Sequence, residues 1–94
     1  MIVGVLKVEF FFPENGSLKE KRYYLRSLKD RLKNLNVSVA EIDHQDLWQR
    51  SKLAVVCASV DFSSAQDMIS KTKNFIEKAY SEFITDIDIE YLKV

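Results

Sequence analysis

Apolar residues recur along this chain with two different spacings, and the changes between them mark out strands and helices. Residues 2–12 are rich in Val, Ile, Leu and Phe and stop at the sequence Pro-Glu-Asn-Gly over residues 13–16, which predicts a strand followed by a turn. Further strands are predicted over residues 37–43, 52–60 and 83–91, the last from its strict apolar–polar alternation. A polar connection over residues 44–50 separates the second strand from the third.

Two segments follow the helical spacing instead. Ser17 and Glu20 have the spacing of a capping box, so a first helix is predicted to begin there and to end near Asn36, because Asn tolerates the left-handed conformation of a C-cap. Its apolar stripe consists of Leu18, Leu25, Leu28 and Leu32. A second helix is predicted from Asp61, and its apolar face consists of Ala65, Met68, Ile69, Thr72, Phe75, Ile76 and Ala79.

The order strand–helix–strand–strand–helix–strand predicts an α+β domain of ferredoxin-like type, β-α-β-β-α-β, over residues 1–94. Right-handed crossovers place both helices on one face of an antiparallel four-stranded sheet, with the first and third strands in the centre. Both central strands are apolar at consecutive positions, over residues 2–6 and 53–58, which favours burial on both faces. We therefore expect a homodimer that forms through the open sheet face or through a strand edge.

The composition is that of a folded protein without a membrane span or an internal disulfide. The 47% hydrophobic and 30% charged residues are ordinary for a folded domain. The apolar N-terminal segment is too short for a spanning helix and lacks a signal-peptide layout, so we expect a cytoplasmic protein without membrane contact. Cys57 is the single cysteine and lies in an apolar run, which favours a buried thiol and excludes an internal disulfide.

The net charge of zero hides a basic first helix. Residues 17–33 carry seven cations and two anions, a net charge of +5. On a helical projection five of the cations form one arc beside the leucine stripe: Lys19, Arg22, Arg26, Lys29 and Lys33. Such an arc is suited to binding a phosphate backbone. The alternative is a solvated helix face without a ligand. Within the arc, only Arg26 has an acidic residue at the i,i+4 spacing, Asp30, that could neutralise its charge.

The polar connection is the second candidate site. Its candidate residues are His44, Gln45, Asp46, Trp48, Gln49 and Arg50, together with Asp43 at the end of the preceding strand. One interpretation is a recognition loop, because Trp and Arg are common hot-spot residues. The structural alternative is that Trp48 caps the end of the core while Asp and Gln satisfy turn amides. One His with two Asp is too little for a metal site, so we expect no metal and no cofactor.

The sequence contains no recognisable set of catalytic residues. Gly4 and Gly16 are the only glycines, so no glycine-rich phosphate loop exists. Ser17, Ser63 and Ser64 are interpreted as helix caps rather than nucleophiles. Asp86, Asp88 and Glu90 in the last strand would repel phosphates, and the third strand lacks the aromatic residues on which RNA-recognition sheets stack bases. We therefore expect a non-enzymatic protein whose first helix, not its sheet, meets any nucleic acid.

Residues 17–22 (Ser-Leu-Lys-Glu-Lys-Arg) and residues 36–50 together resemble the bacterial YlxP-like family, small proteins of unknown function. The resemblance implies a ferredoxin-like fold, a bacterial cytoplasmic source and, because the family's genes often lie among translation-factor genes, an association with RNA or a ribosomal subunit. It brings no catalytic residues. The leading hypothesis is an RNA- or ribosome-associated binding module; the alternatives are a protein-interaction or assembly module and an ACT-like small-molecule sensor.

Overall fold

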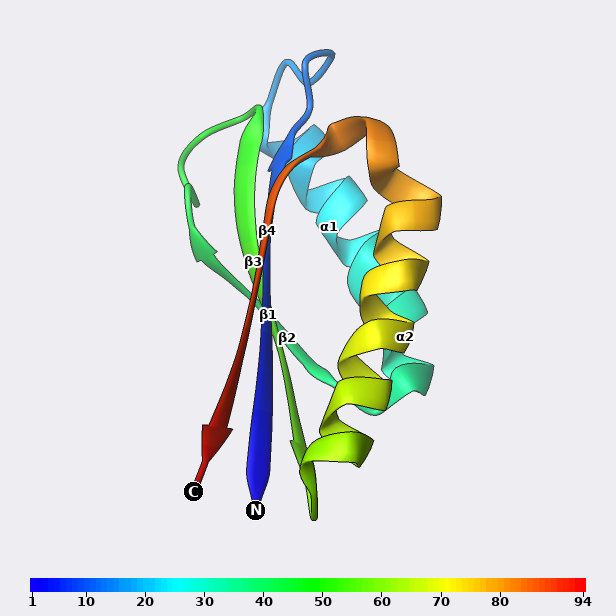
Figure 1. Cartoon of the computed structure of the whole chain (residues 1–94). Coiled ribbons are helices and arrows are strands. Elements are labelled where there is room, and N and C mark those ends of the chain that lie inside the picture. Colours follow the sequence, from blue (N-terminus) through cyan, green and yellow to red (C-terminus); the bar gives the residue numbers. More distant parts are fainter.

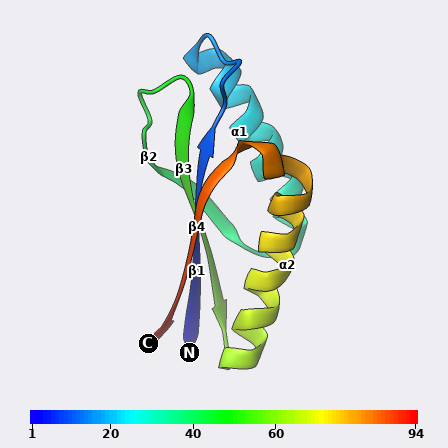
Figure 2. The ribbon, with the colours of Figure 1, turned by 45° about the horizontal axis from the view of Figure 1, so that its top comes forward.

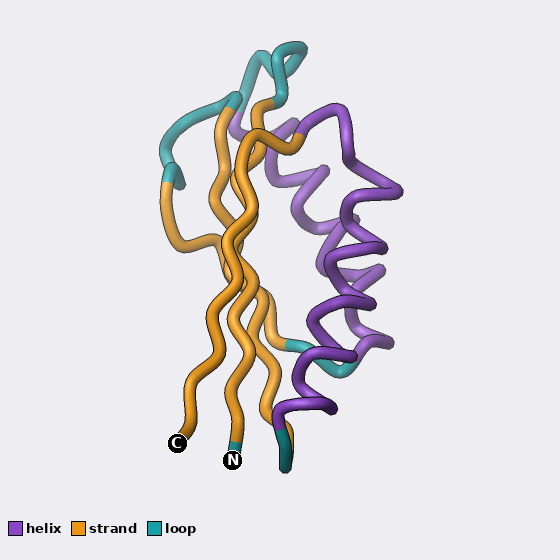
Figure 3. The backbone as a smooth tube through the Cα atoms, viewed as in Figure 1, coloured by secondary structure: helices purple, strands orange, loops and turns teal.

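A four-stranded antiparallel sheet carries two helices on one of its faces in the computed structural model, which describes residues 1–94 (Figure 1). The elements in chain order are β1 (Ile2–Phe11), α1 (Leu18–Leu32), the short 3₁₀ turn η1 (Lys33–Leu35), β2 (Ser38–Asp43), β3 (Arg50–Ser59), α2 (Phe62–Tyr80), η2 (Ser81–Phe83) and β4 (Ile84–Lys93). The strand order β2-β3-β1-β4 confirms the ferredoxin-like prediction, with β1 and β3 in the centre. Helices and strands form two separate layers in Figure 3.

The start of α1 follows the capping pattern of its sequence. The Ser17 side-chain oxygen accepts a hydrogen bond from the Glu20 amide at 3.2 Å, and the Glu20 carboxylate accepts one from the Gly16 amide at 3.1 Å. At the other end α1 tightens into η1, and Asn36 adopts the left-handed conformation with φ 57°. Both predicted ends of this helix are therefore confirmed.

Asp61, not a serine, caps α2. Its carboxylate accepts a hydrogen bond from the Ser64 amide at 2.8 Å, and this bond lowers the pKa of Asp61 below its ordinary value of 3.8. The prediction that Ser63 and Ser64 act as caps was wrong, since both lie inside the first turn of α2. The predicted apolar face of α2 was wrong at its last position, because Ala79 is exposed and Tyr80 is the buried residue there.

The core lies between the helices and one face of the sheet. Alternate residues of the central strands point into it: Leu6, Val8 and Phe10 from β1, and Leu53, Val55 and Cys57 from β3. The buried Cys57 confirms its predicted role as a small core residue. The opposite face of the sheet, which we call the outer face, has no helix over it (Figures 1 and 2).

The fourth strand departs from strict alternation at its beginning. Phe10 pairs with Ile84 and Glu9 pairs with Asp86, so Thr85 is an extra residue that shifts the register. Because of this bulge, Ile84 and Ile87 lie on the helix side, while Asp86 points to the outer face. The chain ends lie together at one end of the sheet, where the Val94 amide donates to the Met1 carbonyl at 2.9 Å (Figure 2).

Candidate functional site

Three of the five cations predicted for the basic arc surround one hollow. Arg22, Arg26 and Lys29 line a shallow cavity of about 250 Å³ between α1 and Glu41 of β2. None of the three forms an ion pair with a carboxylate. We call the exposed surface of Lys19, Arg22, Arg26 and Lys29 the cation face.

The two remaining positions of the arc differ from these three. Lys19 lines a separate hollow with Tyr23 and is also without an acidic partner. Lys33 lies beyond the end of α1, in η1, and pairs with Asp30 at 3.2 Å. The pair expected between Arg26 and Asp30 was therefore wrong, because the exposed Asp30 carboxylate is taken by the cation three residues later in the chain.

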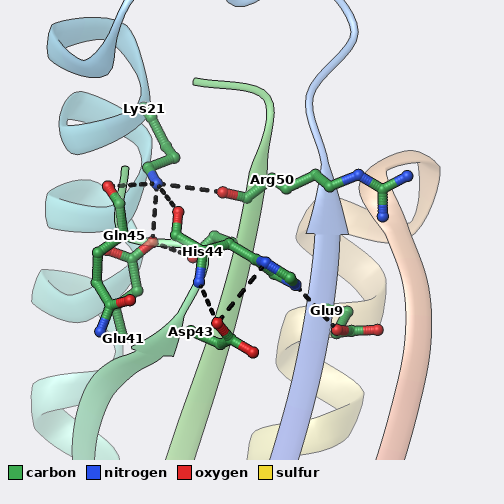
Figure 4. A network of polar contacts seen from close by, with 8 residues as sticks. Glu9, Lys21, Glu41, Asp43, His44, Gln45 and Arg50 are labelled. Atoms are coloured by element: carbon green, nitrogen blue, oxygen red, sulfur yellow. Dashed lines mark hydrogen bonds and ion pairs between the residues drawn. The ribbon is translucent and has the colours of Figure 1, made fainter. Parts of the chain in front are cut away.

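Lys21 is the residue that sequence reasoning missed. Only 1% of its side chain is exposed, and its ammonium group lies 3.0 Å from the Glu41 carboxylate. The same ammonium donates hydrogen bonds to the backbone carbonyls of His44 at 2.7 Å, Gln45 at 3.2 Å and Arg50 at 3.1 Å (Figure 4). A cation inside the fold thus replaces water as the partner of three loop carbonyls, which fixes the loop against α1.

A sequence signal for Lys21 exists. Leu18, Lys21, Leu25, Leu28 and Leu32 are separated by alternating steps of three and four residues, so the lysine occupies a position of the apolar stripe. A cation at such a position must find acceptors in the interior. Glu41 completes the arrangement, because its carboxylate also accepts a hydrogen bond from the Ser51 hydroxyl at 2.8 Å.

The other side of the loop is tied to the turn that follows β1. The Phe12 amide donates to the Gln49 carbonyl at 2.7 Å, and the Asn15 side chain donates to the Trp48 carbonyl at 3.4 Å. The Gln49 side chain in turn donates to the Pro13 carbonyl at 3.0 Å. Since Lys21 holds the Arg50 carbonyl, three successive carbonyls of residues 48–50 are fixed by other parts of the chain. The backbone of the loop therefore has a defined conformation, and we call residues 44–50 the fixed loop.

His44 closes the network on the outer face. Its Nε2 lies 3.3 Å from the Glu9 carboxylate, and its Nδ1 lies 3.8 Å from Asp43 (Figure 4). The backbone of His44 has a positive φ of 63°, a conformation in which His is enriched. The Asp43 carboxylate accepts a hydrogen bond from the His44 amide at 2.8 Å. The histidine thus joins β2 to β1 at the start of the loop.

The rest of the loop surrounds a second hollow, of about 440 Å³, at the loop end of the outer face. It is lined by Phe11, Asp46, Leu47, Trp48, Gln49 and Arg50. The Arg50 guanidinium lies over the Phe11 ring, 5.6 Å from its centroid, which is within the range of a cation–π contact. We call this cavity the Trp48 hollow.

Trp48 does not cap the core. Its side chain is 54% exposed and does not belong to the core cluster. The interpretation of Trp48 as a cap of the core was therefore wrong. Phe12, Tyr24 and Phe83 already close that end of the core, and the ring centroids of the stacked Phe12 and Tyr24 lie 5.3 Å apart. A large apolar side chain on a fixed loop is typical of a binding surface.

The chain has neither a cluster of metal-ligating side chains nor a helix that could span a membrane. No three His, Cys, Asp or Glu side chains gather in an arrangement that could hold a metal ion. No helix has the length and the apolar character needed to cross a membrane. The candidate site is made up of the cation face, the fixed loop and the Trp48 hollow.

Comparison with protein families matches residues 3–89 to DUF503, a protein family of unknown function. The uncharacterized protein YlxP of Bacillus subtilis is 32% identical over 77 residues, covering 81% of this chain and 84% of the relative.

Among solved structures, similar folds occur in proteins of unrelated description. A NIPSNAP domain protein of Burkholderia xenovorans has a TM-score of 0.57 at 12% identity, covering 100% of this chain and 94% of the other. The de novo designed protein Foldit4 has a TM-score of 0.58 at 8% identity, covering 99% and 97%. SnoaB, a cofactor-independent oxygenase of Streptomyces nogalater, has a TM-score of 0.53 at 9% identity, covering 99% and 92%. At such identities the likeness shows the fold alone.

Proposed function

The chain belongs to the YlxP-like family DUF503, whose function is unknown, and we propose that it is a non-enzymatic cytoplasmic module that binds RNA, in association with a ribosomal subunit. The observation that carries this proposal is the cation face beside the fixed loop. Arg22, Arg26 and Lys29 surround one hollow without an acidic partner. Cations that are not paired within the protein are free to replace the counterions of a phosphate backbone.

The one acid beside these cations is already neutralised. Glu41 lines the same hollow, but its carboxylate lies 3.0 Å from the Lys21 ammonium and accepts a hydrogen bond from Ser51. The buried lysine therefore serves the candidate site in two ways, since it fixes the loop and also cancels the charge that would compete for the exposed cations. A phosphate beside Arg22 would meet a net positive hollow.

The sheet is a less suitable surface for RNA. Asp86, Asp88 and Glu90 of β4 lie on the outer face, where they would repel phosphates. Only Glu90 has a cationic partner, Lys7, at 3.5 Å. An RNA strand is therefore expected on α1 and the loop, with its backbone along the cation face and its bases toward the loop.

Charge reversal on the cation face tests the proposal. The variant R22E/R26E/K29E is expected to lose measurable affinity for a fluorescein-labelled uridine-rich RNA and to leave the ribosomal fractions when lysates are sedimented. A matched control, R31E/K71E/K78E, makes the same change of net charge at exposed helix positions off this face and should bind nearly as well as the wild type. Circular dichroism would show that both variants fold. Equal RNA affinity in the first variant and the wild type would contradict the proposal.

A second copy of the chain is the partner we propose for the outer face. At the end near the termini this face is apolar, with Val3, Val5, Ala54, Val56, Ala58 and Leu92. The charged residues Glu9, Lys52 and Asp86 lie together toward the loop end of the same face. Packing of the apolar end against the same end of a second copy would remove it from water, while the charged loop end and the Trp48 hollow stay outside the contact.

A further inference from the structure

We propose that the Trp48 hollow takes one unstacked guanine base of a bound RNA strand. This inference rests on the proposed function, because it names what the loop recognises once the cation face holds the backbone. Single-stranded RNA is recognised when its bases are splayed out, stacked on aromatic or guanidinium planes and hydrogen-bonded along their edges. The Trp48 hollow offers both kinds of surface, since an indole, a phenyl ring, a guanidinium and a carboxylate line it together.

The groups that would hold the base are positioned before a ligand arrives. One face of the Arg50 guanidinium is covered by Phe11 at 5.6 Å, which leaves the N–H groups at its rim for the edge of a base, and Figure 4 shows the Arg50 side chain extended from β3 toward β1. Trp48 is 54% exposed and provides the stacking plane, while its carbonyl is held by Asn15. The backbone of both residues is fixed by contacts outside the loop, so binding would cost less ordering than it would in a free loop.

The size of the Trp48 hollow suits a single base. Its volume of about 440 Å³ lies within the range of about 300–1,000 Å³ that is usual for small-ligand sites. It opens at the loop end of the outer face, whereas the cation face lies on α1, and the fixed loop connects the two surfaces through Lys21. An RNA strand whose phosphates lie along α1 would therefore place one of its bases against the loop.

The polar groups select guanine among the four bases. Guanine is the base whose Watson–Crick edge presents two adjacent N–H donors, which match the two oxygens of a carboxylate such as Asp46. Its other edge presents the O6 and N7 acceptors, which match an arginine fork. Asp46 and Arg50 both line the hollow, and neither is in an ion pair. Adenine, cytosine and uracil each offer the carboxylate a single donor on that edge.

The single tryptophan of the chain gives a direct readout. Four uridine-rich RNAs of equal length, differing only in a central G, A, C or U, would be titrated while Trp48 fluorescence and RNA anisotropy are followed. Binding of the G-containing RNA should quench the fluorescence, and its affinity should exceed the others by about 5- to 100-fold, the usual discrimination of a bidentate base contact. D46N should remove this preference, so that the four RNAs bind with comparable affinity.

The matched control is D67N, which alters an exposed acid on α2 and should keep the preference for G. Comparable affinity of the wild type for all four RNAs, or a D46N variant that still prefers G, would overturn the guanine inference and leave the proposed function standing. Failure of the wild type to bind any of these RNAs or host ribosomal RNA would overturn the proposed function itself. W48A provides a further check, since it should weaken binding and lose the guanine preference while the fold, followed by circular dichroism, is kept.

Discussion

The ammonium group of Lys21 lies 3.0 Å from the carboxylate of Glu41, in a position where only 1% of the lysine side chain is exposed. The two residues come from the first turn of α1 and from the edge strand β2, and Lys21 also binds three carbonyls of the loop. A buried ion pair of this kind contributes little net stability compared with an apolar pair, but the loss of one partner is costly. Lys21 is thus expected to determine the conformation of the loop.

The variant K21M tests that expectation. It leaves Glu41 without its cation and three carbonyls without their donor, so the free energy of unfolding in urea should fall by about 3–5 kcal/mol. The control K19M changes an exposed lysine on the same helix and should alter stability by less than about 0.5 kcal/mol. Similar unfolding midpoints for K21M and K19M would show that the buried pair does not hold the loop.

The salt dependence of RNA binding should report the number of unpaired cations. With about four phosphates neutralised by the cation face, the logarithm of the affinity should fall with the logarithm of salt concentration with a slope of about −3 to −4. R26Q should reduce the slope by about one. K33Q should change it less, because Lys33 is already paired with Asp30 at 3.2 Å. Anisotropy titrations at several salt concentrations measure these slopes, and equal slopes for R26Q and the wild type would exclude Arg26 as a phosphate contact.

The proposed dimer can be tested by placing charge in the apolar part of the outer face. V5K and V56K each put a cation into the apolar contact, where it would lose its hydration, so sedimentation equilibrium should show dimers for the wild type and monomers for both variants. T85K, on β4 beyond this apolar part, is the control and should remain dimeric. A monomeric wild type at all concentrations would contradict the dimer.

α2 packs closely against the sheet at Gly4. A Cβ at this position would lie 2.7 Å from Cγ1 of Ile69 and 3.0 Å from the sulfur of Cys57. G4A should therefore lower the free energy of unfolding by about 1–3 kcal/mol, the usual cost of overpacking. G16A is the control, since the nearest atom to its Cβ would be 4.0 Å away. Urea unfolding measures both, and a G4A variant as stable as G16A would mean that α2 shifts without cost.

Local patterns in the sequence predicted the elements well because the forces that form them are local. Ser17 and Glu20 indicated the start of α1, Asn36 indicated its end, and the leucine spacing indicated its buried stripe. The misplaced cap of α2 at Ser63 or Ser64, in place of Asp61, was an error of a few residues of the kind expected at helix ends. The extra residue Thr85 was not predictable, because a bulge is defined by pairing with a distant strand.

The candidate site divides in the same way. The sequence by itself determined the fold, the basic arc of α1 and a polar loop between β2 and β3, since helical spacing and residue type are local properties. Tertiary structure alone decided that Lys33 is paired, that Trp48 is exposed and that Lys21 is inside. The physical reason is that burial and partnership depend on residues far away in the chain: Lys21 finds its acceptors 20 to 29 positions later, at Glu41 and Arg50.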